Sequence, residues 1–426
     1  MDDGETRAAK TPSRVRLSRV PQAMTQPNLA PPQRPLRILM IAPTSFFSDY
    51  GGHIRILEET RSLQELGHRV TIVTYSKGSD LPGLDIRRTA RLPWHADYEV
   101  GSSRHKLAFD VYLAAQALAE ALRVRPHVIH GHMHEGALIG GVLARLLRAP
   151  LVFDFQGSLT AEMVDHKFLD PHGPVYPWVH RLERFICKLP DAFLTSSIQA
   201  RALLEEQFHV RPARIHPLPD CADITRFDPQ RFPQTAVQPL RRRLGIPADR
   251  LVVAYLGLLT DYQGIPHLLE AALRLKAGGE KVHFLLMGYP NVARYRTLAQ
   301  KKGVADCVTF TGKVEYRDAA HYLALGDIAV APKMSATEGS GKLLNYMAMA
   351  QPIVAYDTPV HREYLGDLGV YAPAGDVDAL AGAIAQLLHD PARRDSLGQA
   401  LRARAATHYS WGRAGEQIGK IYRSLI

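Results

Sequence analysis

The stretch that decides the fold is residues 331–356, which read APKMSATEGSGKLLNYMAMAQPIVAY. An apolar run ends at Pro332 and is followed by the glycine-spaced turn 337–341, a segment with helical apolar spacing and the β-rich run 353–355. This order predicts strand, glycine-rich loop, helix and strand. Glycines let a backbone approach a ligand closely, and the N–H groups at a helix start attract an anion such as phosphate. An ordinary turn without a ligand is the alternative for a single Gly-x-Gly.

The same segment resembles the C-terminal signature of the retaining family-4 glycosyltransferases of the GT-B fold. That signature has a Glu before Gly-x-Gly, a second Glu eight positions on, and then A-M-A-x-G-x-P-V-V-A. The positions that match here are Glu338, Gly339, Gly341, Ala348-Met349-Ala350 and 352–355. The resemblance implies that Glu338 contacts the donor sugar as a catalytic residue. Tyr346 stands where the family has its second Glu, which contacts the nucleotide ribose.

Length and composition indicate a soluble protein of two domains. The chain has 426 residues and a mass of 47.3 kDa, which exceeds the size at which single cores stop growing. It contains no apolar run of about 18 residues and no apolar core behind its charged start, so neither a membrane span nor a signal peptide is expected. Because Cys187, Cys221 and Cys307 match no metal or redox spacing, the sequence predicts a cytoplasmic protein.

The net charge of +10 is spread along the chain. No nucleic-acid-binding motif accompanies it, so no nucleic-acid partner is expected, and an anionic ligand or lipid surface fits better. One basic stretch with an interfacial aromatic predicts peripheral membrane contact, with a solvated loop and helix face as the alternative. Its members are Arg87, Arg88, Arg91, Trp94, Arg104 and Lys106.

The N-terminal region predicts a disordered tail followed by a βαβ opening. Residues 1–35 are rich in Pro, Gln, Arg and Ser, and Met24 within them is an alternative start. The buried-strand run 36–42, the turn 48–52, the helical spacing of 54–66 and the strand 70–73 follow. This opening resembles the same family, in which the Gly51-Gly52 loop faces the acceptor and the donor phosphates. The resemblance adds Gly51 and Gly52 to the donor site and His53 to the acceptor side.

A histidine pattern after residue 127 supports a second hypothesis, a histidine-based metallohydrolase. His130, His132 and His134 alternate, with Glu135 beside them, and imidazoles on one strand face can converge on a zinc ion. However, the resembled family also has V-H-x-H here without a metal. We therefore expect no metal and no cofactor, and the resemblance assigns His132 to the acceptor side.

The next predicted strand, 151–155, leads into a position close to the transferred sugar in the family. The family usually has a His where this chain has Gln156, which can still form hydrogen bonds but cannot exchange a proton. The resemblance implies that Gln156 is catalytic and that Asp154 is on the acceptor side. The run 215–227 resembles the stretch between the domains, so the N-terminal domain is expected to close near residue 235.

The second half repeats the theme of strand and helix, with strands at 251–257 and 282–287 around a helix at 265–275. Alternating strands and helices predict two doubly wound parallel sheets, with ligands beyond the carboxyl ends of the strands. The expected fold is α/β and GT-B, with two Rossmann-like domains facing across a cleft. The domains are an acceptor-side domain at 36–235, a donor-binding domain at 236–405 and a C-terminal helix at 406–426 that crosses back. Asp376 and Asp378 are interpreted as helix caps.

The donor loop departs from the family, which reads G-R-L-x-x-x-K-G and uses the Arg and Lys to neutralise the diphosphate. Leu258 and Gln263 stand in their places. We predict that Lys342, aided by Lys333, takes over this role, although a cation in the first turn of a helix costs about 0.3–1 kcal/mol without an anion. The full donor-binding prediction is Gly51, Gly52, Gly257, Lys313, Val314, Lys333, Gly339, Ser340, Gly341, Lys342 and Tyr346.

The resemblance implies a metal-independent, retaining glycosyltransferase. It would transfer a sugar from a nucleotide diphosphate donor to a glycan or lipid-linked acceptor in glycan, glycolipid or cell-envelope biosynthesis. A non-catalytic or non-nucleotide-donor GT-B relative is one alternative, and the metallohydrolase is the other. The identities of the sugar, the nucleotide and the acceptor stay open.

Overall fold

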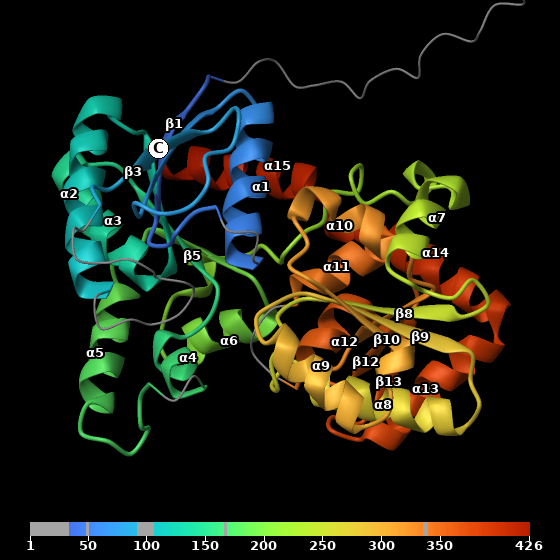
Figure 1. Ribbon diagram of the computed structural model, residues 1–426. Helices are drawn as coiled ribbons and strands as arrows, with labels where there is room; N and C mark the ends of the chain where they lie inside the picture. Colours follow the sequence, from blue (N-terminus) through green and yellow to red (C-terminus); the bar gives the residue numbers. More distant parts are fainter. Residues whose placement is uncertain (1–33, 48–50, 92–105, 166–167, 335–339) are drawn as a thin grey trace, which may run out of the picture. The chain divides into compact units, whose positions relative to one another are not determined.

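Two parallel sheets organise the chain in the computed structural model, which describes residues 34–47, 51–91, 106–165, 168–334 and 340–426 (Figure 1). The chain divides into the units Met1–Pro35 and Leu36–Ile426, and both sheets belong to the second unit. The predicted tail 1–35 lies outside the described residues except for its last two positions.

The first sheet has seven described strands, all parallel, in the order β3-β2-β1-β4-β5-β6-β7. Their side chains are mostly buried because helices cover both faces of a parallel sheet. The strands are β1 (Arg37–Ala42), β2 (Arg69–Thr74), β3 (Asp85–Arg88), β4 (Val128–His132), β5 (Leu151–Phe155), β6 (Ala192–Thr195) and β7 (Ile215–Pro217). The helices are α1 (Gly51–Glu65), α2 (Lys106–Val124), α3 (Met133–Leu147), α4 (Leu159–Asp165), α5 (Tyr176–Ile186) and α6 (Ile198–Glu206).

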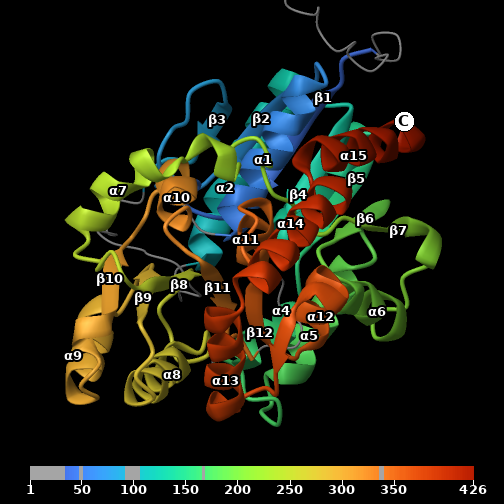
Figure 2. The ribbon, with the colours of Figure 1, turned by 90° about the vertical axis from the view of Figure 1, so that its right-hand side faces the viewer.

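The second sheet has six described strands in the order β10-β9-β8-β11-β12-β13, again all parallel. Helices α8 and α13 pack side by side on it (Figure 2). The strands are β8 (Leu251–Leu256), β9 (Val282–Met287), β10 (Val308–Gly312), β11 (Ile328–Ala331), β12 (Ile353–Tyr356) and β13 (Val370–Ala372). The helices are α7 (Gln234–Arg243), α8 (Ile265–Ala277), α9 (Val292–Lys301), α10 (Tyr316–Leu323), α11 (Gly341–Ala348), α12 (Pro359–Leu365), α13 (Val377–His389), α14 (Pro391–His408) and α15 (Trp411–Leu425).

Side chains cap the starts of two helices, and one of them is the predicted cap Asp376. Ser197 accepts a hydrogen bond from the backbone of Ala200 at the start of α6, and Asp376 accepts one from Ala379 at the start of α13. Both contacts satisfy N–H groups that have no partner inside the helix. The predicted boundary near residue 235 falls in α7, which packs against α10 of the second half.

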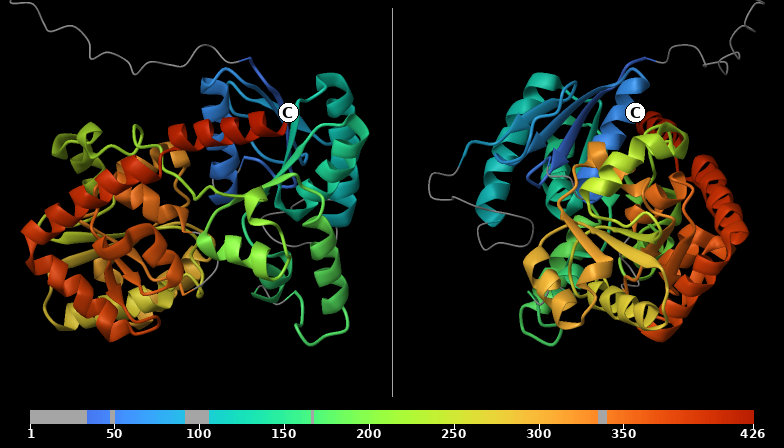
Figure 3. Two further views of the ribbon diagram at one scale, coloured as in Figure 1. Left: turned by 180° about the vertical axis from the view of Figure 1, so that it is seen from behind. Right: turned by 45° about the vertical axis from the view of Figure 1, so that its right-hand side comes forward.

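The last helix, α15, returns from the second half and packs on α1 of the first (Figure 3). The two helices approach closely at Gly415, where an added Cβ would lie 2.5 Å from the Cβ of Ser62. The Tyr422 hydroxyl lies 2.6 Å from Nδ1 of His130 on β4, which ties the helix to the first sheet. In the described part of the chain, no helix combines the length and apolarity needed to cross a membrane.

Candidate active site

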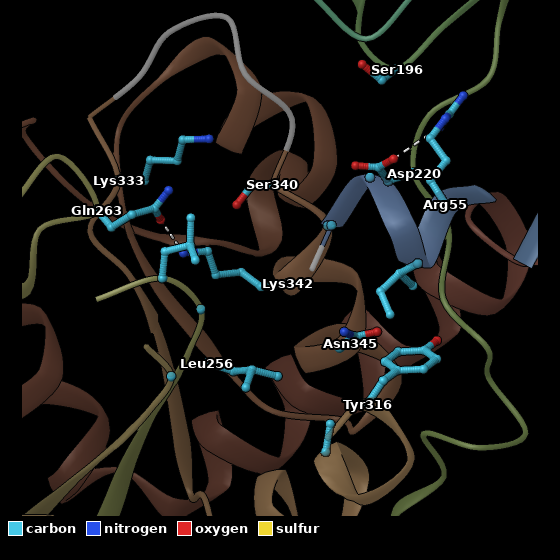
Figure 4. Close-up of a pocket in the computed structure, with 18 of the residues that line it drawn as sticks. Arg55, Ser196, Asp220, Leu256, Gln263, Tyr316, Lys333, Ser340, Lys342 and Asn345 are labelled. Carbon is cyan, nitrogen blue, oxygen red and sulfur yellow. Dashed lines mark hydrogen bonds and ion pairs between the residues drawn. The ribbon is translucent and has the colours of Figure 1, made fainter. Parts of the chain in front are cut away.

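A cavity of about 350 Å³ lies at the carboxyl ends of strands from both sheets (Figure 4). Open parallel sheets bind their ligands at such strand ends. The first half contributes Gly51, Gly52, Ile54, Arg55, Gln156, Glu162, Ser196, Asp220 and Cys221. The second half contributes Leu256, Gly257, Leu258, Gln263, Gly288, Tyr289, Tyr316, Ala319, Lys333, Ser340, Gly341, Lys342, Asn345 and Trp411.

Two backbone segments come unusually close at the floor of the cavity. Gly257 and Gly288 follow β8 and β9, and the N–H of Gly257 donates to the carbonyl of Met287 at 2.9 Å. A Cβ at Gly288 would lie 1.7 Å from the carbonyl oxygen of Gly257, so only glycine fits there. The cavity can therefore extend down to the peptide groups of both strand ends.

The start of α11 provides groups that attract an anion. Ser340 precedes the first helical residue, Gly341, and its buried hydroxyl has no hydrogen-bond partner among the described residues. The N–H groups of a first helical turn carry partial positive charge toward the cavity. Lys333, which follows β11, and Lys342 also line the cavity (Figure 4).

Lys342 stands against the loop that lacks the family's cations. Its Nζ donates to Oε1 of Gln263 at 2.6 Å and to the hydroxyl of Tyr255 at 3.2 Å, and it lies 4.5 Å from the centre of the Tyr255 ring. The ammonium group is thus beside Gln263, the position at which the resembled family has its Lys. This arrangement places one cation next to the loop 257–264 from a different element.

Tyr346 does not face the cavity, so its predicted contact with a ribose is wrong for this structure. The side chain is fully buried, and its hydroxyl accepts from the N–H of Leu256 at 2.7 Å and lies 3.3 Å from the carbonyl oxygen of the same residue. Successive helix residues point about 100° apart, and Asn345, one position earlier, lines the cavity instead. Tyr346 holds α11 against the end of β8.

On the opposite side, Gln156 is oriented by a charged pair behind it. Its Nε2 donates to Asp154 at 2.7 Å, while a Cβ on Gly52 would lie 3.6 Å from its Oε1. Asp154 is fully buried and accepts from Arg55 at 2.7–3.0 Å. Burial would raise the pKa of Asp154, but Arg55 and His132 outweigh it and hold that pKa far below its usual range. The amide oxygen of Gln156 is therefore turned toward the cavity as an acceptor.

Behind Gln156 lies a buried cluster whose ligand atoms could hold a metal ion: Glu59, His130, His132 and Asp154 within 4.8 Å of one another. The rings of His130 and His132 stack with their centres 4.4 Å apart. The guanidinium of Arg55, however, lies 2.7 Å from Asp154 and 3.1 Å from Glu59 and already supplies positive charge to both carboxylates. A divalent cation here would be repelled by Arg55, so the residues do not fit a metal site.

The expectation that three histidines share one strand face is wrong, because β4 ends at His132. Met133, between His132 and His134, has a φ of 56° and begins α3, to which His134 and Glu135 also belong. His134 points to a different partner, with Nε2 3.3 Å from Glu183. The histidine pattern therefore divides between a strand and a helix.

The remaining predicted residues fall into three groups. The first group lines the cavity and consists of Gln156, Gly51, Gly52, Gly257, Lys333, Ser340, Gly341 and Lys342. A second group lies outside the cavity lining: His53, His132 and Asp154, which are buried, and Lys313 and Val314. Nε2 of His53 lies 2.5 Å from the Thr44 hydroxyl. Glu338 and Gly339 lie outside the described residues.

The predicted membrane stretch is only partly described. Arg87 pairs with Asp85, and Arg88 pairs with Asp80 and donates to the carbonyl oxygen of Phe46 at 2.6 Å. Trp94 and Arg104 lie outside the described residues, as does the side chain of Lys106. Arg88 is therefore used inside the fold, and Arg87 pairs within its own strand.

The sequence prediction missed several polar residues of the cavity, among them Arg55, Glu162, Ser196, Asp220 and Asn345. Arg55 donates to Asp220 at 3.1 Å, and burial raises the pKa of Asp220 more than Arg55 lowers it. Ser196 and Asp220 both follow closely on the carboxyl ends of strands, β6 and β7, where open parallel sheets bind their ligands. Nothing in the sequence spacing marks Arg55, because its partners lie 99 and 165 residues away.

Matches to two protein families show which class of enzyme contains this cavity. Residues 237–404 match the family described as glycosyl transferases group 1, and residues 51–221 match the glycosyl transferase 4-like domain. The chain is a glycosyltransferase. Together the two matches cover most of both halves and every described residue that lines the cavity except Trp411.

Individual relatives agree with this glycosyltransferase family. The chain is 24% identical over 394 residues to a phosphatidyl-myo-inositol mannosyltransferase of Mycobacterium leprae, covering 92% of this chain and 97% of that protein. It is 26% identical over 296 residues to an alpha-D-kanosaminyltransferase of Streptomyces kanamyceticus, covering 67% and 73%. Both relatives are glycosyltransferases.

Solved structures show that this glycosyltransferase has the GT-B fold. Sucrose-phosphate synthase from Thermosynechococcus elongatus superposes with a TM-score of 0.75 and 20% identity, over 92% of this chain and 99% of that one. The Anabaena protein HepE in complex with UDP-glucose superposes with a TM-score of 0.72 and 17% identity, over 92% and 100%. The predicted family and fold are thus confirmed.

Proposed function

We propose that this glycosyltransferase transfers a sugar from a nucleoside diphosphate donor, with retention of configuration and without a metal ion. The observation that carries the proposal is the set of groups at the start of α11. One cavity is lined by the Ser340 hydroxyl, which has no partner among the described residues, by the N-terminus of α11, and by the ammonium groups of Lys333 and Lys342. A diphosphate is the ligand whose charge and oxygen atoms complement these groups. The solved complex of the structural neighbour HepE with UDP-glucose supports a donor of this class.

Nucleoside diphosphates test the proposed donor directly. A ligand present at about 100 times its dissociation constant stabilises the folded state by about 2.7 kcal/mol, so the matching nucleotide should raise the melting temperature. Transfer of the sugar from the corresponding donor, with the anomeric configuration read by NMR, then tests the reaction. No shift with any nucleoside diphosphate would overturn the nucleotide donor.

We expect Lys342→Met to weaken nucleoside diphosphate binding at least about tenfold, or 1.4 kcal/mol. The reason is that Lys342 replaces the cations missing at Leu258 and Gln263. Isothermal titration measures the affinity, with Lys281→Met as the control because Lys281 is exposed, pairs with Asp249 and does not line the cavity. Equal affinity of Lys342→Met and the wild type would remove Lys342 from the donor site.

In the proposed reaction, the bond between the anomeric carbon and the diphosphate oxygen breaks while a bond to the acceptor hydroxyl forms. The proton of that hydroxyl ends on the released diphosphate. This route suits Gln156, whose amide can hydrogen-bond a sugar hydroxyl but cannot take the proton. Fixed charges such as Lys333 and Lys342 stabilise the negative charge that develops on the leaving group. Glu338 keeps its proposed role of orienting the donor sugar, and Glu338→Gln with full turnover would contradict it.

The alternative is a relative with another donor or with no catalytic activity. Leu258 and Gln263 favour it, because they remove two cations from the donor loop. Donor hydrolysis measured across nucleotide sugars separates the two cases. Hydrolysis of one donor supports the enzyme, whereas binding without turnover of any donor or acceptor supports the non-catalytic relative.

For the acceptor we propose a glycan or a lipid-linked sugar at the cytoplasmic side of a membrane. The relative named phosphatidyl-myo-inositol mannosyltransferase, which this chain spans almost completely, supports a lipid-linked acceptor. The unpaired thiols of Cys187, Cys221 and Cys307 suit a reducing compartment. Extraction of the radiolabelled product into organic solvent distinguishes a lipid-linked from a water-soluble acceptor.

A further inference from the structure

Helix α5 exposes apolar side chains that a helix of its length normally buries. Trp178 is 69% exposed, and Leu182 and Phe185 follow at helical spacing on the same side. Val175 immediately before the helix is exposed as well. Single exposed apolar residues are ordinary, but several together on one short helix indicate an interaction surface.

The neighbouring helix α3 enlarges this surface. It packs against α5 and exposes Val142 and Leu146, one helical turn apart and each 62% exposed. We call the two helices together the α3–α5 face. Its apolar members are Val142, Leu146, Val175, Trp178, Leu182 and Phe185.

The α3–α5 face carries positive charge around its apolar residues. The guanidinium of Arg181 lies 5.5 Å from the centre of the Trp178 ring, so a cation and an interfacial aromatic lie side by side. The exposed cations are Arg145, Arg148, Arg181, Arg184 and Lys188. The only acid within α5, Glu183, is fully buried, and the only one within α3, Glu135, lies in the first turn, away from Val142 and Leu146.

The inner side of α5 fixes this orientation. Glu183 accepts hydrogen bonds from the backbone of Leu159 at 2.8 Å and Thr160 at 3.1 Å, and Ile186 is buried in the core. Helix α4, which Glu183 caps, contributes Glu162 to the lining of the cavity. The exposed side of α5 therefore belongs to a rigid element that is one helix away from the proposed acceptor side.

We propose that the α3–α5 face docks on a membrane surface that contains anionic lipids. Apolar and aromatic side chains that lie among cations suit the interface between headgroups and acyl chains, and each cation near an anionic surface adds attraction. The inference rests on the proposed lipid-linked acceptor, because docking at α5 would bring the cavity close to that acceptor. A partner protein would be expected to present acids to these cations instead.

Co-sedimentation with vesicles tests the docking without any sugar transfer. The full chain should bind phosphatidylcholine vesicles that contain phosphatidylglycerol and bind pure phosphatidylcholine weakly. Arg181→Gln/Arg184→Gln/Lys188→Gln should lower the partition coefficient at least about tenfold. The control Lys281→Gln/Arg317→Gln/Arg393→Gln removes the same charge from exposed positions of the second half and should bind like the wild type.

A second variant tests the apolar part. Trp178→Ser/Leu182→Ser should also lower vesicle binding, and vesicles should shift the wild-type Trp178 fluorescence to shorter wavelength, with Trp178→Phe as the reference. Equal losses in the charge variant and its control would overturn the proposal, as would binding that ignores phosphatidylglycerol. A dimer that the serine variant abolishes in solution would also overturn it, because the face would then join two copies. Donor hydrolysis without acceptor reports separately on the proposed function.

Discussion

Arg55 is the side chain that orders the wall of the cavity contributed by the first half. It is buried and pairs with Asp154, Glu59 and Asp220. Burial raises the pKa of Glu59 well above its usual range, and the neighbouring Asp154 adds to this effect. One guanidinium therefore keeps several buried acids compatible with folding and holds Asp154 against Gln156.

We predict that Arg55→Met lowers the free energy of unfolding by about 3–5 kcal/mol, because it leaves Asp154 buried without a counter-charge. Urea unfolding at neutral pH measures the change. Arg201→Met on α6 is the control, since Arg201 pairs with Glu205 one helical turn away and both side chains are partly exposed, at 43% and 30%, where such a pair contributes about 1 kcal/mol or less. Similar losses in both variants would show that Arg55 is not a special case.

Tyr346 and Asn345 should separate structural from ligand-binding roles on α11. Tyr346→Phe removes the contacts with Leu256 and should cost about 1 kcal/mol of stability, while nucleoside diphosphate affinity stays within about twofold. Asn345→Ala removes a side chain that lines the cavity and should reduce that affinity more than stability. Titration and urea unfolding of both variants measure the two effects, and the reverse pattern would restore the original role of Tyr346.

For single residues, the sequence correctly predicted positions that depend only on neighbouring residues in the chain. Lys342 lies in the first turn of α11 as expected, because a turn and a helix start are encoded within a few residues. Tyr346 was misplaced because the face that α11 buries depends on β8, about 90 residues earlier. Arg55 was missed for the same reason, since its partners come from other strands.

Among the elements, α4 depends on a carboxylate from its neighbour. Glu183 of α5 accepts from the first N–H groups of α4 and from the Thr160 hydroxyl at 2.6 Å. Burial would raise its pKa, but the contacts with His134, Thr160 and Ser158 prevail and lower it to about 2. The start of α4 is thus capped twice, by its own Ser158, whose hydroxyl accepts from the backbone of Ala161 at 3.2 Å, and by a carboxylate of another element.

We predict that Glu183→Gln lowers stability at neutral pH by about 3 kcal/mol. The folded pKa lies below the usual 4.5, so the stabilisation is complete above about 4.5 and is lost as the pH falls toward 2. The difference between Glu183→Gln and the wild type should therefore shrink between neutral pH and pH values near 3. Urea unfolding at both pH values measures it, with the exposed Glu206→Gln as the control; a pH-independent difference would contradict the charge argument.

Element order was largely predictable, whereas one boundary was not. Strands of both sheets were found because their buried runs are continuous, as parallel sheets require. The start of α3 at Met133 was missed, since the alternating histidines continue the strand pattern past His132. The change occurs at Met133, whose positive φ no periodicity reveals.

For the whole molecule, the contact between α15 and α1 couples the two halves. We predict that Gly415→Ala destabilises the protein, because its Cβ would collide with Ser62. Gly412→Ala in the same helix should instead be neutral or stabilising by up to about 1 kcal/mol, since nothing lies within 4 Å of its added Cβ. Calorimetry measures both melting temperatures. If the two variants melt alike, the close approach does not matter for stability.

The architecture of the whole molecule followed from the sequence, but the junction between its halves did not. Alternating strands and helices predict parallel sheets, and the signature around 338–355 indicated the family. The cavity, in contrast, brings together Gly52, Gln156, Asp220, Gly257 and Lys342, whose proximity only the packed chain defines.

The return of α15 also has a consequence for synthesis on the ribosome. All seven described strands of the first sheet, and α1, leave the exit tunnel long before residues 411–425. Until then, the side of α1 that contains Ser62 is uncovered and His130 lacks the Tyr422 hydroxyl. The N-terminal half of a nascent chain therefore exposes this side of α1 until α15 has been synthesised. A chaperone that shields this side of α1 would act during that interval.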